Sequence, residues 1–299
     1  MHPGYISLIA LSVIALTSNL TTAQPRIQTP SLDNYNNENE YPSVSTIIEL
    51  AIERANLQDD SEIELDYVSS ISTVSNSLNG DGVITKTETT LHKQYAVENF
   101  LYQELIERNG NELTKKERGK EEKRREKFVQ EIRKKSRLDK KIETNDERQV
   151  AFDRELMDRY EAVVEGISNI RGEPCWVLAF KPRPGKIPTK TRMDKALNRS
   201  TGKLYITKSD YGVAKIEFAM QEPIKYLWGV AATLRKAVGR LEFERVTSNV
   251  WAPKIFDFEI EARVLFKTVR RQIIREWTEH RPLDTFTTPK NIERINVSP

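Results

Sequence analysis

The strictest constraint on this chain is an alternation of apolar and polar residues near its C-terminal end. Every second position is apolar, at Phe256, Phe258, Ile260, Ala262, Val264 and Phe266. The positions between them carry charge, at Asp257, Glu259, Glu261 and Arg263. A period of two places the two sets on opposite faces of a β-strand. The segment therefore belongs to an antiparallel sheet that buries one face and leaves the other in solvent.

The same alternation recurs upstream and predicts most of the sheet. Ile63, Leu65 and Tyr67 share one phase, and a second alternating run covers residues 83–97. The tetrapeptide Asn-Gly-Asp-Gly at residues 79–82 is a strong hairpin turn signal between them. Further strands are predicted at residues 160–165, 175–181, 204–207, 213–221, 229–239 and 267–279. About ten or eleven strands without a βαβ rhythm predict an α+β fold that is mainly β.

Two regions interrupt the strands with helical spacing. Residues 44–55 place apolar side chains three and four positions apart, behind a capping serine. Residues 115–149 carry 15 Lys and Arg against nine Asp and Glu. Their apolar residues cover about half of a helix, and these are Phe128, Val129, Ile132, Leu138 and Ile142. With a second helical stretch predicted at residues 147–160, the segment 111–158 is a charged helical insertion between strands.

The N-terminal segment predicts export. Residues 1–23 contain no Lys, Arg, Asp or Glu, and include an apolar run of 12 positions at residues 5–16. Small residues follow, with Thr21 and Ala23 placed for cleavage after Ala23. The mature protein is therefore expected in the periplasm or otherwise outside the cytoplasm, with an uncleaved membrane anchor as the alternative. Behind the signal peptide we expect a flexible leader at 24–43, one domain at 44–282 and a C-terminal tail at 283–299.

The sequence carries no readable catalytic or metal site. Its one cysteine, Cys175, excludes an internal disulfide and a multi-cysteine zinc site. No nucleophile elbow, dinucleotide fingerprint, P-loop or HExxH motif occurs. The three histidines are far apart in the sequence, at positions 2, 92 and 280. We therefore expect a protein that is not an enzyme, with no catalytic residue, no metal and no cofactor.

The remaining reactive side chains have plain structural interpretations. His92 falls on the polar phase of its strand and is expected at the surface. His280 is expected at a strand end, and Cys175 is expected as a small buried residue in a central strand. The acids within residues 257–261 are expected in solvent, opposite the apolar phase. An inward orientation would instead let them perturb one another's pKa in acid-base or cation-binding roles.

The charged insertion suggests a partner. Its excess of six positive charges at residues 115–149 can attract a polyanion. An anionic membrane surface is the partner considered, because export argues against nucleic acid. Interleaved acids also form attractive pairs four residues apart, such as Glu121 with Arg125 and Glu131 with Lys135. A mixed, solvated helix face is therefore the alternative.

Four segments together resemble a known group of exported proteins. They are GEPCWVL at residues 172–178, KPRPG at 181–185, LNRSTGKLYITKSDY at 197–211 and VWAPK at 250–254. With them the chain resembles the bacterial outer-membrane lipoprotein-sorting proteins of the lipoprotein-localisation superfamily, which includes LolA, LolB and the mycobacterial lipoprotein carriers. The resemblance covers residues 150–280 well and residues 44–110 loosely.

The resemblance implies a strongly curved, unclosed antiparallel half-barrel, with an apolar concave face covered by helices. It also implies an apolar ligand, such as an acyl chain, a lipid or a lipoprotein, that is carried through the envelope. A buried methylene contributes about 0.8 kcal/mol, so a sixteen-carbon chain forfeits on the order of 12 kcal/mol in water and needs an enclosed apolar surface.

The residues predicted to line the concave face are Trp176, Leu178, Phe180, Phe218, Met220, Trp228, Leu234, Phe256, Phe258 and Ile260. An ordinary filled core is the alternative for the same residues, because alternating apolar side chains commonly pack against one another. In that case the protein is an envelope interaction or scaffold protein of the same fold, whose charged helices dock a partner.

Overall fold

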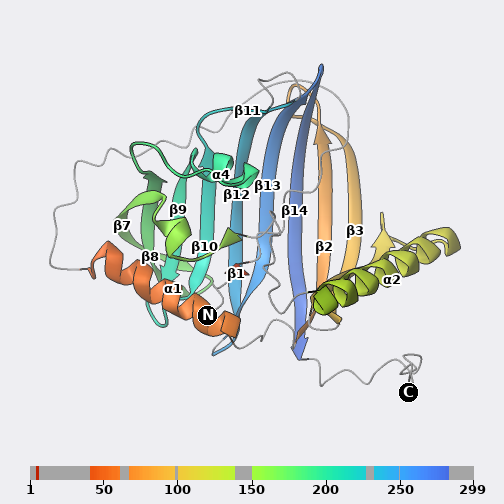
Figure 1. The fold of residues 1–299 in the computed structure, drawn as a ribbon, viewed down its shortest axis with the longest axis horizontal. Helices are drawn as coiled ribbons and strands as arrows, with labels where there is room; N and C mark the ends of the chain where they lie inside the picture. The colour runs from red at the N-terminus through yellow and green to blue at the C-terminus, as the bar shows by residue number, and fades with distance from the viewer. Residues whose placement is uncertain are drawn as a thin grey trace.

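The protein is built around one open antiparallel sheet of twelve strands (Figure 1). The computed structural model describes residues 5–6, 41–60, 67–97, 100–138, 150–226, 232–248 and 250–282. Within these residues the sheet begins and ends at two strands that do not pair with each other. The predicted fold class, mainly β with a curved, unclosed half-barrel, is confirmed.

The strands fall into two runs along the chain. The first run is β2 (Tyr67–Leu78), β3 (Ile84–Val97), β4 (Phe100–Arg108) and β5 (Asn111–Glu112). The second run is β7 (Tyr160–Ile170), β8 (Glu173–Pro182), β9 (Ser200–Thr207), β10 (Val213–Met220), β11 (Ile224–Tyr226), β12 (Ala232–Thr247), β13 (Val250–Val264) and β14 (Lys267–Pro282). The order across the sheet is β5-β4-β3-β2-β14-β13-β12-β10-β9-β8-β7, and β11 pairs with β12. The two runs therefore join where β14 pairs with β2.

The structure confirms the main sequence signals for this sheet. Residues 79–82 form the turn between β2 and β3, and Asn79 Oδ1 accepts hydrogen bonds of 2.9 Å from the N–H groups of Asp81 and Val83. The alternating C-terminal segment is β13, with Phe256 and Phe258 buried. Twelve strands exceed the predicted ten or eleven because β5 and β11 are very short and β4 shows no alternation in its sequence.

The acids of β13 lie on the face opposite its phenylalanines, as expected. They form ion pairs with bases on the neighbouring strands. Lys236 Nζ lies 2.7 Å from Glu259, and Arg270 Nε donates a hydrogen bond of 2.8 Å to Glu261. Each carboxylate is thus balanced by a cation, and this face of the sheet does not bring the acids together as an acid-base group.

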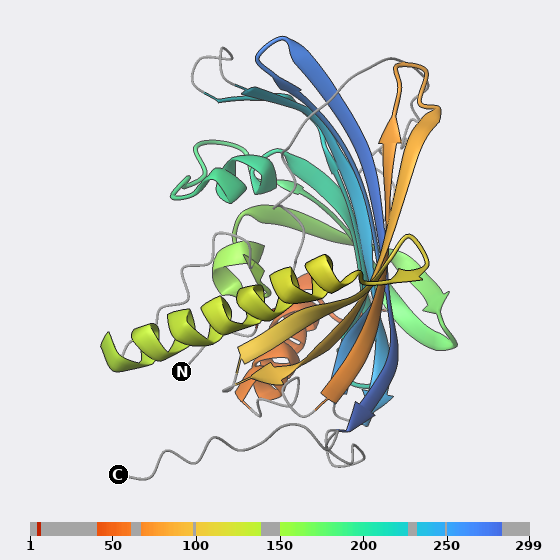
Figure 2. The same cartoon turned by 90° about the vertical axis from the view of Figure 1, so that its right-hand side faces the viewer.

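Three helices cover one face of the sheet, which curves toward them (Figure 2). They are α1 (Val44–Asp60), α3 (Arg154–Met157) and α4 (Arg192–Leu197). The α1 helix begins behind Ser43, whose Oγ accepts a hydrogen bond from the Thr46 N–H. It buries Ile47 and Ala51, one turn apart on the side of the helix that faces the sheet. We call the covered side the concave face and the other side the outer face.

The predicted second helix at residues 147–160 is wrong. Of its described residues, 150–160, only Arg154–Met157 is helical, and Val150–Ala151 is a two-residue strand, β6, paired with β1 (Tyr5–Ile6). Tyr160 already belongs to β7, where its ring packs on Phe180 with centroids 4.9 Å apart. Burial of this aromatic pair in the sheet outweighs the local helical spacing.

The charged helix α2 (Lys115–Leu138) lies beside β4 at the end of the sheet and projects toward the side that carries the other helices (Figure 2). Glu121 accepts hydrogen bonds from the backbone N–H of Leu105 and from the Tyr102 hydroxyl. Arg124 donates to the backbone carbonyl of Gln103. These side chains satisfy backbone groups that a sheet edge otherwise leaves open to pairing with another chain.

Several sequence predictions lie outside the described residues. They concern most of the signal peptide, most of the leader, residues 139–149 of the insertion, the C-terminal tail and the positions Ile63, Leu65 and Trp228. In the part of the chain that is described, no helix combines the length and the apolarity needed to cross a membrane.

Asp210, in the turn between β9 and β10, ties α1 to the sheet. Its carboxylate accepts hydrogen bonds from Trp251 Nε1 at 3.0 Å and from Arg245 Nη2 at 3.1 Å, and lies 3.5 Å from Arg54 Nε of α1. Burial acts to raise the pKa of Asp210. Hydrogen bonds from Thr207, Trp251 and the Gly212 N–H, with the charge of Arg245, outweigh burial and lower it.

Replacing this carboxylate by an amide, Asp210→Asn, is expected to lower the free energy of unfolding by about 2 kcal/mol at pH 7, because donors in this site then face a neutral amide. Urea denaturation measures the difference. Because the folded pKa is lowered, the stabilisation is complete above the unfolded pKa and is lost as the pH falls through the folded pKa, so the difference in stability between the two proteins should disappear once the pH lies below the folded pKa. Asp81→Asn, in an exposed turn, is the control. An equal effect of both substitutions would contradict this role of Asp210.

Candidate functional site

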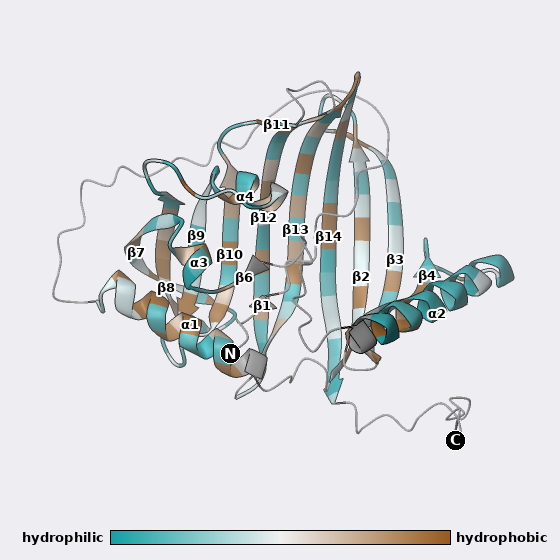
Figure 3. Ribbon diagram, viewed as in Figure 1, coloured by the Kyte–Doolittle hydropathy of each residue, from teal (hydrophilic) through white to brown (hydrophobic). Residues whose placement is uncertain are grey.

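Apolar side chains form continuous ladders across the concave face. Residues directly opposite in antiparallel strands share a face. One ladder runs from β8 to β13 through Leu178, Leu204, Ile216, Leu241 and Phe256. Figure 3 shows the alternating bands of apolar and polar residues along these strands, and an α2 helix that is mostly polar. The concave face of β8–β13 is therefore a continuous apolar surface.

A second ladder alternates phenylalanine with glycine. It runs through Phe180, Gly202, Phe218, Gly239 and Phe258 on five successive strands. A Cβ atom built on Gly239 would lie 2.8 Å from Phe218 Cζ and 3.0 Å from Phe258 Cδ2. A Cβ atom on Gly202 would lie 2.8 Å from Phe180 Cζ. The aromatic rings therefore lie over the glycines. Because glycine has no side chain, it leaves room for the rings close to the sheet.

The structure brings together the described members of the predicted site. Trp176, Leu178, Met220, Leu234, Phe256 and Phe258 are buried in one core cluster, and Phe180, Phe218 and Ile260 are partly buried against it. The tenth residue, Trp228, lies outside the described residues. Both interpretations of this set, a ligand surface and a filled core, need the side chains to be adjacent, so their assignment to a ligand stays a prediction.

The ladder gives a direct test of the packing. Gly239→Ala is expected to lower the free energy of unfolding by about 1–3 kcal/mol, because two aromatic rings and the Asp257 carbonyl crowd the new methyl group. Gly119→Ala is the control, since nothing lies within 4 Å of that position on α2 and alanine favours a helix. Chemical denaturation should show loss at Gly239 and a small gain at Gly119. A neutral Gly239→Ala would contradict the described ring positions.

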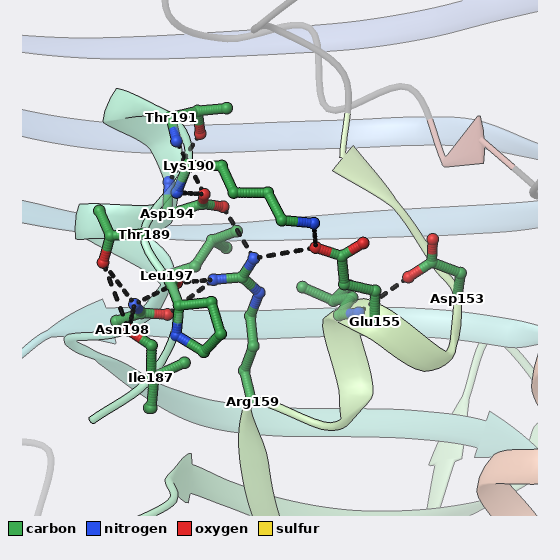
Figure 4. A network of polar contacts seen from close by, with 12 residues as sticks. Asp153, Glu155, Arg159, Ile187, Thr189, Lys190, Thr191, Asp194, Leu197 and Asn198 are labelled. Carbon is green, nitrogen blue, oxygen red and sulfur yellow. Dashed lines mark hydrogen bonds and ion pairs between the residues drawn. The ribbon is translucent and has the colours of Figure 1, made fainter. Parts of the chain in front are cut away.

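A polar clamp holds α3 and α4 together over the concave face (Figure 4). Its centre is Arg159, whose side chain is 7% exposed and whose Nη2 lies 2.9 Å from Asp194 of α4 and 3.7 Å from Glu155 of α3. Nη1 of the same guanidinium donates to Asn198 Oδ1 at 2.8 Å and to the Pro188 carbonyl at 3.1 Å. The two short helices and the loop before α4 are thus fixed as one cover.

The concave face changes character at β14. Arg275 stands directly opposite Phe256 on one side and Thr73 of β2 on the other. The Nε and Nη1 atoms of Arg275 and the Oγ1 atom of Thr73 are buried without a hydrogen-bond partner among the described residues. Burial lowers the pKa of the Arg275 guanidinium. Neither residue was predicted, because the sequence pattern assigns no face to residues 267–279 and shows no alternation around Thr73.

His92 is not the surface residue that its strand phase predicts. It stands opposite the buried Ile71, on the concave face, and is only partly exposed. Burial, followed by the charges of Arg275 and Arg124, lowers the pKa of His92 to about 4. The prediction is wrong because the apolar phase of β3, with Leu91, lies on the outer face.

The other two reactive residues have structural roles. Cys175 is fully buried, as predicted, although β8 is next to the edge strand rather than central. Burial raises the pKa of its thiol to about 11, so the thiolate is scarce at neutral pH. His280 lies near the end of β14, as predicted, with Nδ1 2.7 Å from Ser69 Oγ. No cluster of three His, Cys, Asp or Glu side chains suited to a metal ion occurs among the residues the structure describes.

Several solved structures are similar to this chain at low sequence identity. A domain described as an outer membrane lipoprotein-sorting protein from Vibrio parahaemolyticus is 10% identical, with a TM-score of 0.36, over 82% of this chain and 96% of that chain. A LolA superfamily protein from Nitrosomonas europaea is 10% identical, with a TM-score of 0.28, over 81% and 94%. MucB of Pseudomonas aeruginosa, in its complex with MucA, is 9% identical, with a TM-score of 0.23, over 78% and 99%.

The proteins matched include the group that the sequence segments resemble. No protein-family profile matches this chain, and no curated protein matches it.

Proposed function

We propose that this protein is an exported, non-enzymatic binding protein that holds an apolar chain against the concave face of its sheet and carries it through the envelope. The observation that supports this most is the continuous apolar surface of β8–β13. A flat sheet without a cover cannot enclose an apolar chain, because a ligand lying on it stays in contact with water. A curved sheet with helices on its concave side can enclose one.

The place where a ligand would meet solvent is the border of the apolar ladders at β14. Ile273 stands directly opposite Phe258 on the concave face and is partly exposed. Its neighbour Ile274 stands opposite Asp257 on the outer face and is also partly exposed. These consecutive isoleucines differ mainly in the face they occupy, so they form a matched pair for testing which face binds.

The test uses 1-decanol, a neutral ten-carbon probe, and the chain that begins at Gln24. We expect Ile273→Gln to weaken decanol binding at least about fivefold in isothermal titration calorimetry, because a buried amide without partners opposes an apolar chain. Ile274→Gln should bind like the parent protein. Thermal unfolding of both variants verifies that they fold.

Two outcomes would contradict the proposal. Absence of decanol binding to the parent protein favours the filled-core alternative, in which the same fold serves as an envelope scaffold. Equal effects of Ile273→Gln and Ile274→Gln place the bound chain elsewhere than on the concave face.

Export is the other part of the proposal. Cleavage after Ala23 would remove Tyr5–Ile6, so the small β1–β6 sheet would be absent from the mature protein. N-terminal sequencing of the protein from an envelope fraction is expected to begin at Gln24. A chain that retains residue 5 would support the membrane-anchor alternative.

Contact of the basic segment 115–149 with an anionic membrane surface stays a prediction. In the described part, α2, Glu121 and Arg124 are engaged with the edge of β4, and Glu117 lies 3.3 Å from Arg108. Nucleic acid is not proposed as a partner.

A further inference from the structure

Beyond the apolar ladders, the concave face becomes basic. On β14, Arg271 and Arg275 share the face of Phe256 and Ile260, because they stand directly opposite these residues. On β4, Arg108 stands opposite Thr90, which in turn stands opposite Thr73 in the row of Arg275. We call Arg271, Arg275 and Arg108 the basic end of the concave face. The acid Glu88 on the same face is already hydrogen-bonded to Lys86, at 2.7 Å.

Within the described residues, the buried guanidinium nitrogens of Arg275 lack the hydrogen-bond partners that buried polar groups normally have. Two of its three guanidinium nitrogens, Nε and Nη1, are buried and have no hydrogen-bond partner in the described parts of the chain, and no carboxylate there lies within ion-pair distance of it. The Thr73 hydroxyl directly opposite is also buried without a partner. These are three polar atoms in one place, all able to donate a hydrogen bond.

An unpaired buried guanidinium is unfavourable for the folded protein, since a buried charge is normally paired. The same group becomes favourable when an anion binds, because charge-assisted hydrogen bonds are strong where water is excluded. Arginine in particular matches the two oxygens of a carboxylate or a phosphate. The arrangement therefore selects for an anionic partner.

We propose that Arg275 and Thr73 bind the anionic headgroup of the amphipathic ligand whose apolar chain lies along β8–β13. The inference rests on the proposed function and specifies its ligand class, an acyl or alkyl chain that ends in a carboxylate or a phosphate. Neighbouring strands are about 4.8 Å apart, so Arg275 on β14 lies next to the Phe256 end of the apolar ladder. One ligand can thus contact both parts of the face.

The test compares three probes with the same ten-carbon chain: decanoate, decyl phosphate and 1-decanol. Calorimetric titration of the chain that begins at Gln24 is expected to show at least one of the anionic probes binding about tenfold or more tightly than decanol. Tighter binding of decyl phosphate indicates a phospholipid-type headgroup, and tighter binding of decanoate indicates a fatty acid. Either result supports the shared anion site.

Arg275→Met removes the charge and keeps an apolar side chain. It should reduce the affinity for the anionic probe to that for decanol, and leave decanol binding within about twofold of the parent. Its melting temperature should equal or exceed that of the parent, because the unpaired buried charge is gone. Arg270→Met is the matched control, since Arg270 is on the same strand but pairs with Glu261 on the outer face. It should retain the preference for the anion.

The imidazole of His92 offers a readout that does not depend on affinity. The charged groups that act on it are Arg275 of β14, Arg124 and Glu121 of α2, and Arg108 of β4. An anion held by Arg275 offsets a positive charge, so decyl phosphate, which stays anionic at the acidic pH where His92 titrates, should raise the pKa of His92, measured by NMR of its ring protons. Decanol should leave it unchanged.

The outcomes separate the two proposals. If decanol and the anionic probes bind the parent equally, or if Arg275→Met keeps the anion preference, the anion site is wrong while the apolar face stands. If none of the three probes binds, the proposed function itself is contradicted.

Discussion

A single open sheet has two faces and two edges, and apolar residues in this chain form ladders on one of those faces. Those residues must be covered, and α1, α3 and α4 lie over them (Figure 2). On the outer face of β13, acids pair with bases on neighbouring strands. At one edge α2 occupies the backbone groups of β4. The helical cover follows from the apolar face, the ion pairs from the polar face, and the contacts of α2 from the unpaired backbone groups of the sheet edge.

The curved face is also where the chain departs from an ordinary core. The Phe-Gly ladder lets aromatic rings lie close to the sheet over Gly202 and Gly239. Beyond it, the same face carries Arg275 with buried nitrogens that find no partner among the described residues. An unpaired buried arginine is unfavourable in a filled core, whereas on the proposed ligand-binding face an anionic group of the ligand would pair with it. Our proposal treats the apolar ladders and the basic end as two parts of one ligand surface.

Much of this fold can be predicted from the sequence, because period-two alternation is a local signal. Residues 256–266 indicate a strand with one buried face, and the Asn-Gly-Asp-Gly turn predicts the β2–β3 hairpin. The resemblance carried by residues 172–211 and 250–254 adds the curvature. The strand β4 was missed, because it forms through pairing with β3 and not through an alternating sequence. The helix around α3 was predicted too long, because Tyr160 is buried in the sheet as part of β7.

The site is less predictable than the fold. The apolar members, such as Phe258, are visible from their alternation, but the pairing order that places β14 beside β2 depends on contacts between residues about 200 positions apart. Arg275, Thr73 and His92 therefore could not be brought together from the sequence. His92 was predicted at the surface but lies on the concave face, because the more apolar phase of β3 is on the outer face.

The measurement that tests this account most directly is native mass spectrometry of the protein isolated from an envelope fraction without detergent, followed by organic extraction and lipid analysis. We expect a stoichiometric adduct whose extracted component is an anionic amphiphile with an acyl or alkyl chain. A mass equal to that of the protein alone, and unchanged after incubation with fatty acid and phospholipid, would contradict it and indicate a filled-core interaction protein.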